Sequence, residues 1–135
     1  VAVVLYKMAG SPNVVYRNVF SDVGAGHYFA KAAVWAHDYG IISGLVGGSL
    51  GVGQPIRRED FVVMLYRYAE YRGLDTSAMD LLDKYTDSGL VSGYAWAPVG
   101  WAVAHGIMGN DAYLWPKNNI TRAEIVFMIY KFLCL

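Results

Sequence analysis

The sequence predicts an all-α fold made of tandem helical repeats joined by long glycine-rich loops. Three segments, Val1–Ala9, Phe61–Ala69 and Ile125–Leu133, each hold a tyrosine followed by a basic residue and can be aligned on that pair. Their apolar residues recur three and four positions apart, which is the spacing of an amphipathic helix. The copies stand about sixty residues apart, and self-similarity at such a period is typical of repeat architectures.

A second helix is predicted ahead of the last two copies. The segment Ala33–Gly44 aligns with Val99–Asn110 and shares a tryptophan, an alanine, a glycine and an isoleucine in the same order. The apolar spacing in both segments is again that of a helix. We therefore expect helices over residues 28–39 and 95–105.

Four residues are expected to form the turns that follow these helices. Gly40 and Gly106 would end the helices in the left-handed conformation that glycine adopts without strain. Gly44 and Asn110, at the last aligned position, belong to the two residue types that best tolerate a positive φ. Pro98 is compatible with a helix only in the first turn, where its missing N–H costs no hydrogen bond.

The repeats divide the chain into four segments. We expect residues 1–12 to be the terminal helix of a truncated first unit, 13–73 to be a whole second unit and 85–135 a whole third unit. Residues 74–84 would connect these two units, because the charged stretch there is typical of a solvated segment. Two residues of the connector could cap a short helix: Thr76 and Ser77.

Composition argues against several classes of partner. The chain is 56% hydrophobic and 15% aromatic, and its 11 basic and 11 acidic residues cancel. A nucleic acid or an anionic membrane surface would need a broad positive field, so any bound anion must be held by a few placed arginines. Residues 88–110 carry no formal charge, yet glycines, a proline and a histidine interrupt them too often for membrane insertion.

Residue types also argue against catalysis, metals and cofactors. The three histidines, His27, His37 and His105, stand far apart and lack metal-ligand spacing. Cys134 is the only cysteine, so no intrachain disulfide is possible. No arrangement typical of a nucleophile with its base, or of paired catalytic carboxylates, stands out, and we expect neither a resident cofactor nor an enzyme.

The motif that opens the last helix separates into two parts. Thr121 and Glu124 have the spacing of a capping box, which predicts a helix start whatever the protein does. Arg122 lies between them in the first helical turn, where its charge faces the positive end of the helix dipole, so helix capping does not explain an arginine there. A neighbouring carboxylate or a ligand anion would explain it. Both can bind Arg122 together, because arginine binds carboxylates through several donors.

The two whole units share these motifs in the same order, and in this the chain resembles the S-layer homology domain. The resemblance covers nearly the whole chain. It rests on FSDV, HYFAKAAVWAHDYGIISG and REDFVVMLYRYA in the second unit, and on YTD, WAVAHGIMGN, LWPKNNITRAE and MIYKFL in the third.

The resemblance implies a pseudo-threefold spindle of helical units with binding grooves between neighbours. It implies a non-catalytic, extracellular module at the bacterial cell surface, attached to a larger parent protein. Its partner would be a secondary cell-wall polysaccharide, often one with a pyruvate ketal on an amino sugar. The alternative is that degenerate units have lost glycan binding and act as a structural or protein-interaction module.

The family's motif arginine maps onto Arg122 in full context and onto Arg58 in a weakened one. The resemblance therefore makes Arg122 the first candidate for binding a ligand anion and Arg58 the second. Around Arg58 the threonine and the alanine of the motif are lost, and Leu50-Gly51-Val52 replaces a loop of the Leu114-Trp115-Pro116 type. Trp35 and Trp101 are expected in the core. Trp96 and Trp115 are further candidates for glycan contact, and Tyr28, Tyr94 and Tyr113 are weaker ones. Asp87 and Asp22 are candidates too, although both are also plausible turn formers.

Overall fold

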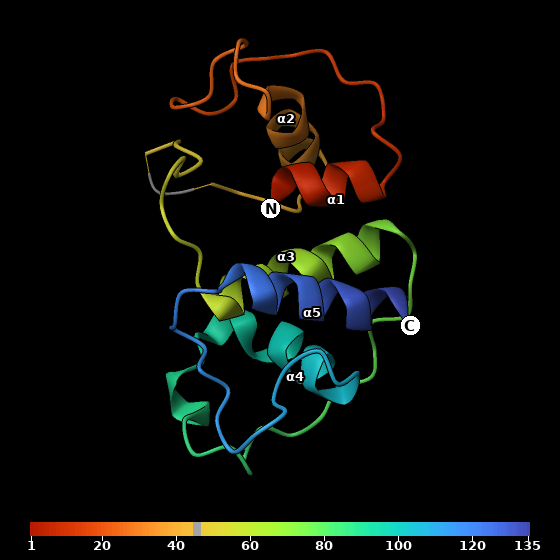
Figure 1. The fold of residues 1–135 in the computed structure, drawn as a ribbon, viewed down its shortest axis with the longest axis vertical. Helices are drawn as coiled ribbons and strands as arrows, with labels where there is room; N and C mark the ends of the chain where they lie inside the picture. The colour runs from red at the N-terminus through yellow and green to blue at the C-terminus, as the bar shows by residue number, and fades with distance from the viewer. Residues whose placement is uncertain (45–46) are drawn as a thin grey trace. The chain divides into compact units, whose positions relative to one another are not determined.

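The computed structural model describes residues 1–44 and 47–135. The regular secondary structure of these residues is helical, with no β-strand among them (Figure 1). This confirms the predicted all-α class. Two short 3-10 helices, η1 (Ser88–Leu90) and η2 (Gly93–Ala95), precede the fourth α-helix. The α-helices of the described residues are α1 (Ala2–Met8), α2 (Ala30–Asp38), α3 (Arg58–Tyr71), α4 (Trp96–Ala104) and α5 (Arg122–Leu133).

The chain folds as two compact units, Val1–Gln54 and Pro55–Leu135. In the first unit α1 packs on α2, and in the second α3 packs on α4 and on η2. The closing helix of one sequence repeat therefore packs against the opening helix of the next repeat. The compact units are offset by one helix from the repeats that the sequence defines.

Each unit is built around a tryptophan that the sequence places in the core. Trp35 and Trp101 are fully buried, as predicted. The ring of Trp35 meets Tyr6 edge to face with centroids 5.6 Å apart, and Trp101 meets Tyr66 in the same way at 5.6 Å. In these two cases the tyrosine that precedes the basic residue packs on the tryptophan of the following repeat.

The helices expected over residues 28–39 and 95–105 agree with α2 and α4 to within two residues. The third helix begins three residues before the aligned segment Phe61–Ala69, and the connector does not form a helix. Pro98 is the third residue of α4, in the first turn as predicted. In the connector, the Asp75 carboxylate accepts hydrogen bonds from Ser77 N at 2.9 Å and from Ser77 Oγ at 2.6 Å. This closes a local turn instead of the short helix that Thr76 or Ser77 was expected to cap.

The turn glycines follow the prediction, with one correction. Gly40 and Gly106 have φ of 71° and 70°. Gly44 has φ of 85°, and a Cβ there would lie 2.7 Å from the ring of Phe20, so both the backbone conformation and the space require glycine at this position.

The positive φ expected at Asn110 was wrong. Gly109 takes it instead, with φ of 80°. Gly109 stands three positions after Gly106, whereas Gly44 stands four positions after Gly40, so the glycine comes one position earlier. Tyr85, which aligns with Phe20, lies against Gly109 and donates its hydroxyl hydrogen to the Gly109 carbonyl at 2.8 Å.

The predicted capping box of α5 is confirmed. The Thr121 hydroxyl accepts a hydrogen bond from Glu124 N at 3.1 Å, and the Glu124 carboxylate accepts one from Thr121 N at 3.0 Å. Two N–H groups at the helix start that would otherwise lack a partner are satisfied in this way.

Replacing Thr121 by alanine is expected to lower the free energy of unfolding by about 1 kcal/mol, because the helix loses its side-chain cap. Urea denaturation followed by circular dichroism measures this change. Thr86→Ala is the matched control, since Thr86 is an exposed threonine outside any helix and its loss should cost less than about 0.5 kcal/mol. An equal loss in both variants would contradict the capping role.

Candidate functional site

The start of α3 is capped by the backbone of the α4–α5 loop, residues 105–121. Arg58 N donates to the Asn118 carbonyl at 2.9 Å, and Glu59 N donates to the Pro116 carbonyl at 3.0 Å. The residue before the helix, Arg57, makes no side-chain cap. Because these carbonyls satisfy the free N–H groups, the threonine missing from this copy of the motif is not needed.

The side chain of Arg58 extends from the start of α3 to the α4–α5 loop and to α5. Its side chain is only 12% exposed. Its Nε donates to the Leu114 carbonyl at 3.2 Å, and one terminal nitrogen forms an ion pair with Glu124. Burial lowers the pKa of Arg58, while the carboxylates of Asp111 and Asp87 oppose this change. The guanidinium remains charged, as arginine does in proteins.

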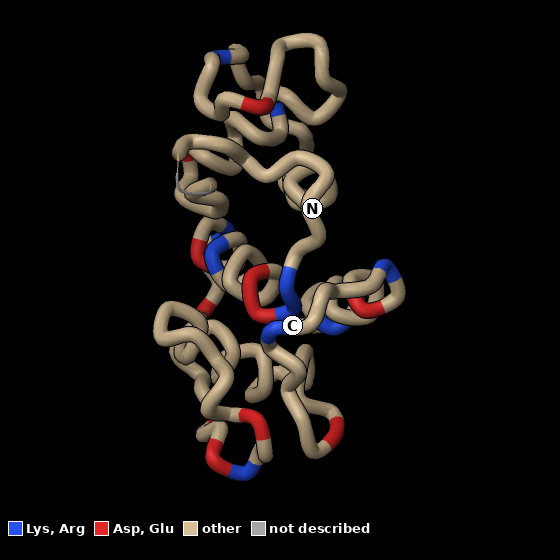
Figure 2. Tube along the Cα trace, turned by 90° about the vertical axis from the view of Figure 1, so that its left-hand side faces the viewer, with Lys and Arg blue, Asp and Glu red and all other residues tan. Residues whose placement is uncertain are grey.

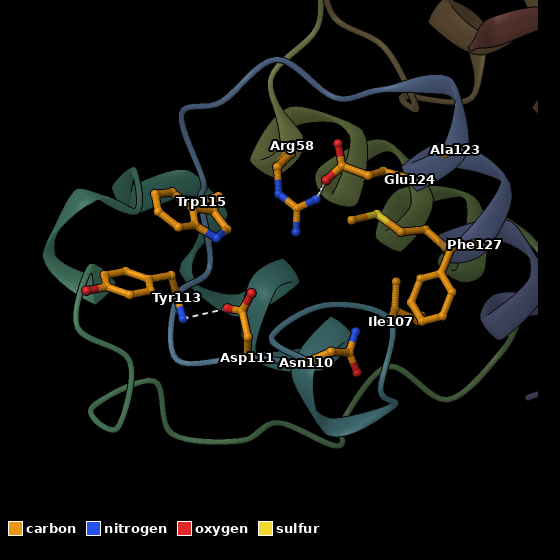
Figure 3. A pocket seen from close by; sticks show the side chains of 10 residues that line it. Arg58, Ile107, Asn110, Asp111, Tyr113, Trp115, Ala123, Glu124 and Phe127 are labelled. Atoms are coloured by element: carbon orange, nitrogen blue, oxygen red, sulfur yellow. Dashed lines mark hydrogen bonds and ion pairs between the residues drawn. The ribbon is translucent and has the colours of Figure 1, made fainter.

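Arg58 lines a groove of 440 Å³, called here the Arg58 groove. Figure 3 shows the other terminal nitrogen of Arg58 directed toward the middle of this groove. Tyr113 and Trp115 form part of its wall, with their rings stacked 4.7 Å apart at 26°. The full lining is Arg58, Ile107, Asn110, Asp111, Tyr113, Trp115, Ala123, Glu124, Phe127 and Met128.

Trp115 is held in an unusual backbone conformation. Its φ is 53°, a left-handed value that is rare for a bulky residue. Asp87 supports this conformation by accepting hydrogen bonds from Leu114 N and Trp115 N, both at 2.8 Å. The ring is 44% exposed. Strained residues of this kind are found at functional sites, where the surrounding structure maintains them.

Asp22 has the corresponding role in the first unit. Its carboxylate accepts from Leu50 N at 2.7 Å, and from Gly51 N and Val52 N at 2.9 Å each. These hydrogen bonds, the one from Leu50 foremost, lower the pKa of Asp22. Both aspartates therefore organise the loop that follows the opening helix of their repeat, and glycan contact by either stays a prediction.

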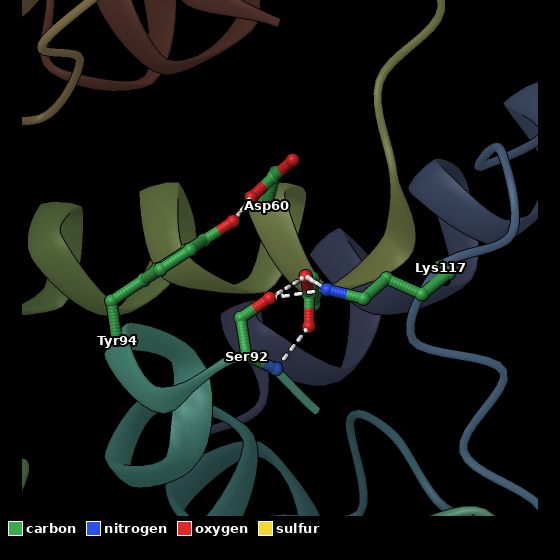
Figure 4. A network of polar contacts seen from close by, with 5 residues as sticks. Asp60, Ser92, Tyr94 and Lys117 are labelled. Carbon is green, nitrogen blue, oxygen red and sulfur yellow. Dashed lines mark hydrogen bonds and ion pairs between the residues drawn. The ribbon is translucent and has the colours of Figure 1, made fainter. Parts of the chain in front are cut away.

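A buried carboxylate lies at the start of α3, where the related motif has alanine. Glu59 is fully buried and accepts hydrogen bonds from Ser92 N at 3.0 Å, Ser92 Oγ at 2.6 Å and Lys117 Nζ at 2.7 Å (Figure 4). Burial raises the pKa of Glu59, but the hydrogen bonds from Lys117 and Ser92 lower it further, to a net value below the usual range. At the position where the motif has alanine, this copy therefore has a glutamate that joins α3 to Ser92 and Lys117.

Tyr94 lies in η2, contacts α3 through Asp60 and is not part of the groove lining. Its hydroxyl donates to the Asp60 carboxylate at 2.5 Å (Figure 4). Burial, together with this hydrogen bond, raises the pKa of Tyr94 to about 12. The phenol hydrogen is committed to Asp60, so a sugar at Tyr94 would meet the ring or the oxygen lone pairs.

The predicted site residues are only partly gathered in one place. Arg58 and Trp115 line the Arg58 groove together, and Asp87 supports its wall. Trp96 and Tyr94 lie outside the lining. Sequence reasoning missed two lining residues, Asp111 and Phe127. The only signal for Asp111 was its position in a loop, and the only signal for Phe127 was its helical spacing. Tyr113 was predicted only as a weaker candidate.

Arg122 is exposed at the first position of α5 and is not part of the groove lining. Within the described chain, no hydrogen bond or ion pair of its side chain is found. The carboxylate neighbour expected for a motif arginine is instead found at Arg58, which pairs with Glu124. Binding of an anion by Arg122 stays a prediction.

Two further features limit the kinds of site that the described residues form. No three side chains among their histidines, cysteines, aspartates and glutamates gather where they could hold a metal ion. None of their helices combines the length and the apolar character needed to span a membrane.

Comparison with known proteins agrees with the repeat found in the sequence. No curated protein matches the chain. The family model of the S-layer homology domain matches residues 19–62 and 84–126, which is more than half of the sequence and gives one match in each of the two repeated segments. The chain therefore belongs to the S-layer homology domain family, whose members are in general non-catalytic modules that associate with the cell surface and bind cell-wall polymers.

Proposed function

We propose that this chain anchors an exported bacterial protein by binding a secondary cell-wall polysaccharide in the Arg58 groove. The observation that carries the proposal is the composition of the groove. A stacked aromatic pair, a guanidinium nitrogen directed inward and several side-chain oxygens converge on a space of 440 Å³. A mainly apolar or aromatic wall with a few convergent polar groups is typical of a small-ligand site.

The groove offers complementary contacts for the two faces of a sugar unit. The exposed ring of Trp115, backed by Tyr113, provides a flat surface for the C–H face of a pyranose. The carboxylates of Asp111 and Glu124 accept hydrogen bonds only, so they suit hydroxyl and amide hydrogens of the ligand. Asn110 can donate or accept as the ligand requires.

Charge restricts the ligand further. One guanidinium faces two carboxylates in the lining, so a highly anionic polymer would be repelled. A single carboxylate next to the inward nitrogen of Arg58 would be bound by a charge-assisted hydrogen bond. An amino sugar with one pyruvate ketal carries both the hydrogen-bond donors and the single carboxylate. Arg122, exposed at the equivalent helix start, is proposed to bind the same kind of group.

One observation favours the alternative of a structural or protein-interaction module. Arg58 already has two partners, the Leu114 carbonyl and Glu124, and could serve only to join α3 to α5. In that case the wall polysaccharide would not be a ligand, and the chain would instead form a stable complex with a protein partner.

Replacing Arg58 by glutamine is expected to reduce co-sedimentation with purified bacterial cell walls at least about tenfold, because the ligand carboxylate loses its charged donor. Arg122→Ala should also reduce it, because it removes the other proposed donor to a ligand carboxylate. Arg17→Gln is the matched control, since Arg17 is an exposed arginine paired with Asp38 in the first unit. Circular dichroism shows whether each variant keeps its helices.

A ligand-side experiment tests the same site without any substitution. Cell walls from which mild acid has removed the pyruvate ketals should no longer sediment the unmodified chain. Undiminished sedimentation would exclude the role of the ketal, and unchanged binding by Arg58→Gln would exclude the groove. Failure to bind any wall polysaccharide at low salt, together with a stable heteromeric complex, would establish the alternative.

A further inference from the structure

The first unit contains a second cavity, of 280 Å³, which shares no residue with the Arg58 groove. It lies between α1, which contributes Tyr6 and Lys7, and the start of α2, which contributes Lys31. Tyr6 and Lys7 project from one side of α1 together with Val3, three and four residues before them. We call this cavity the Lys7–Lys31 pocket.

The charges of the first unit are distributed unevenly around this pocket. Charged residues are sparse along the trace (Figure 2), and five side chains carry them in residues 1–54. Arg17 pairs with Asp38 at 2.5 Å, and Asp22 accepts three backbone N–H groups. The remaining two, Lys7 and Lys31, have no ion-pair partner within the described part of the chain, and both line the pocket.

Two unpaired ammonium groups at one cavity favour an anionic occupant. None of the described residues that line the pocket is acidic, so no carboxylate of the lining offsets the positive charge of the two lysines. An anion in the pocket would be attracted by both. Both lysines are exposed, so water and salt weaken the attraction, and the expected affinity is modest.

The walls of the pocket are aromatic and partly fixed in position. The Tyr6 hydroxyl donates to the Pro12 carbonyl at 2.6 Å, and the Tyr16 hydroxyl donates to the Val23 carbonyl at 2.8 Å. These bonds hold the two rings at the pocket wall. Tyr28 also lines it and is 89% exposed, which leaves a large ring surface open to a ligand.

His27 adds a hydrogen-bond donor. Its Nδ1 accepts a hydrogen bond from Gly24 N at 3.1 Å, so the neutral imidazole carries its hydrogen on Nε2. The ring stacks on Phe29 with centroids 4.9 Å apart, which fixes its plane. The pocket therefore combines two cations, one further donor and exposed aromatic rings.

We propose that the Lys7–Lys31 pocket binds the anionic group of an acidic saccharide, a carboxylate or a phosphate, with the sugar ring against the tyrosines. The site is independent of the Arg58 groove, since it belongs to the other compact unit. A simple anion would use only the lysines, and a neutral sugar only the rings. An acidic sugar contacts both the lysines and the rings, so it should bind more tightly than a simple anion or a neutral sugar.

Nuclear magnetic resonance titration of the ¹⁵N-labelled chain tests the proposal with four probes: glucuronate, glucose 6-phosphate, glucose and inorganic phosphate. At least one acidic sugar should cause saturable shifts of the amides of residues 3–7 and 27–32, more strongly than glucose or phosphate. Lys7→Gln and Lys31→Gln should each weaken that binding about fivefold. Arg17→Gln is the charge-matched control, expected to leave the affinity unchanged.

Arg58→Gln separates this site from the proposed function, because it removes the guanidinium of the Arg58 groove and should leave these shifts in place. Equal affinity for glucose and for the acidic sugars would overturn the role of the lysines. Equal affinity for phosphate and for glucose 6-phosphate would overturn the role of the sugar ring. If both acidic sugars fail to shift these amides in the unsubstituted chain, the pocket is not a saccharide site, whatever the variants do.

Discussion

Replacing Trp101 by alanine is expected to lower the free energy of unfolding of the second unit by about 3–5 kcal/mol, the range for truncating a buried tryptophan. Trp101 is fully buried on α4. Its ring meets Tyr66 of α3 at 5.6 Å and Phe132 of α5 at 6.4 Å between centroids. Because all three helices of the unit contact this ring, its loss leaves a cavity that none of them can close alone.

Trp96→Ala is the matched control on the same helix. Trp96 is 41% exposed, so its loss removes little packing and should cost less than about 1 kcal/mol. Urea denaturation followed by circular dichroism compares the two variants without relying on the fluorescence that both substitutions change. A similar cost at both positions would contradict the assignment of Trp101 as the centre of the unit.

Replacing Glu59 by glutamine is expected to cost about 2 kcal/mol of stability at neutral pH, because Lys117 and Ser92 lose a charged acceptor inside the protein. The cost stays below that of a fully buried ion pair, since Lys117 is 38% exposed and can turn to water. Asp60→Asn is the control. It changes the neighbouring carboxylate, whose hydrogen bond with Tyr94 lies at the surface.

The same residue makes the unit sensitive to acid. The folded state lowers the pKa of Glu59, so its contribution is fully present above the ordinary glutamate pKa of 4.5. The contribution is lost as the pH falls through the lower folded value. Stability measured against pH should therefore decline less steeply in Glu59→Gln than in the unsubstituted chain. Parallel curves would show that another carboxylate of this unit, such as Asp75, whose pKa is lowered by hydrogen bonds from Ser77, accounts for the acid sensitivity.

Local sequence patterns were enough to predict the helices and their ends. The helical spacing around Trp35 and Trp101 identified both the helices and the buried residues, because amphipathic spacing reports directly on burial. The capping box at Thr121 was predictable for the same reason, since its two hydrogen bonds join residues three positions apart.

Features that depend on distant residues were not predictable in this way. Nothing near Arg58 in the sequence shows that carbonyls of the α4–α5 loop cap α3, or that Glu124 pairs with its guanidinium. The motif around Arg58 lacks the threonine and the alanine of the family pattern. In the structure the loop carbonyls cap the helix in place of the threonine, and Glu59, in place of the alanine, binds Ser92. This arginine nevertheless lines the groove. The positive φ lies at Gly109 and not at Asn110 because the two glycines after α4 are three positions apart instead of four, which alignment by residue type concealed.

The pairing of helices across repeat borders determines where the chain can be divided. A cut at the border between sequence repeats would separate α3 from α4, and Glu59 from Ser92 and Lys117. A cut after Gln54 leaves these partners in one fragment. Recombination that exchanges whole sequence repeats between related proteins would therefore create new core interfaces. Exchange at Gln54 would carry the Arg58 groove and its buried network intact into a new protein.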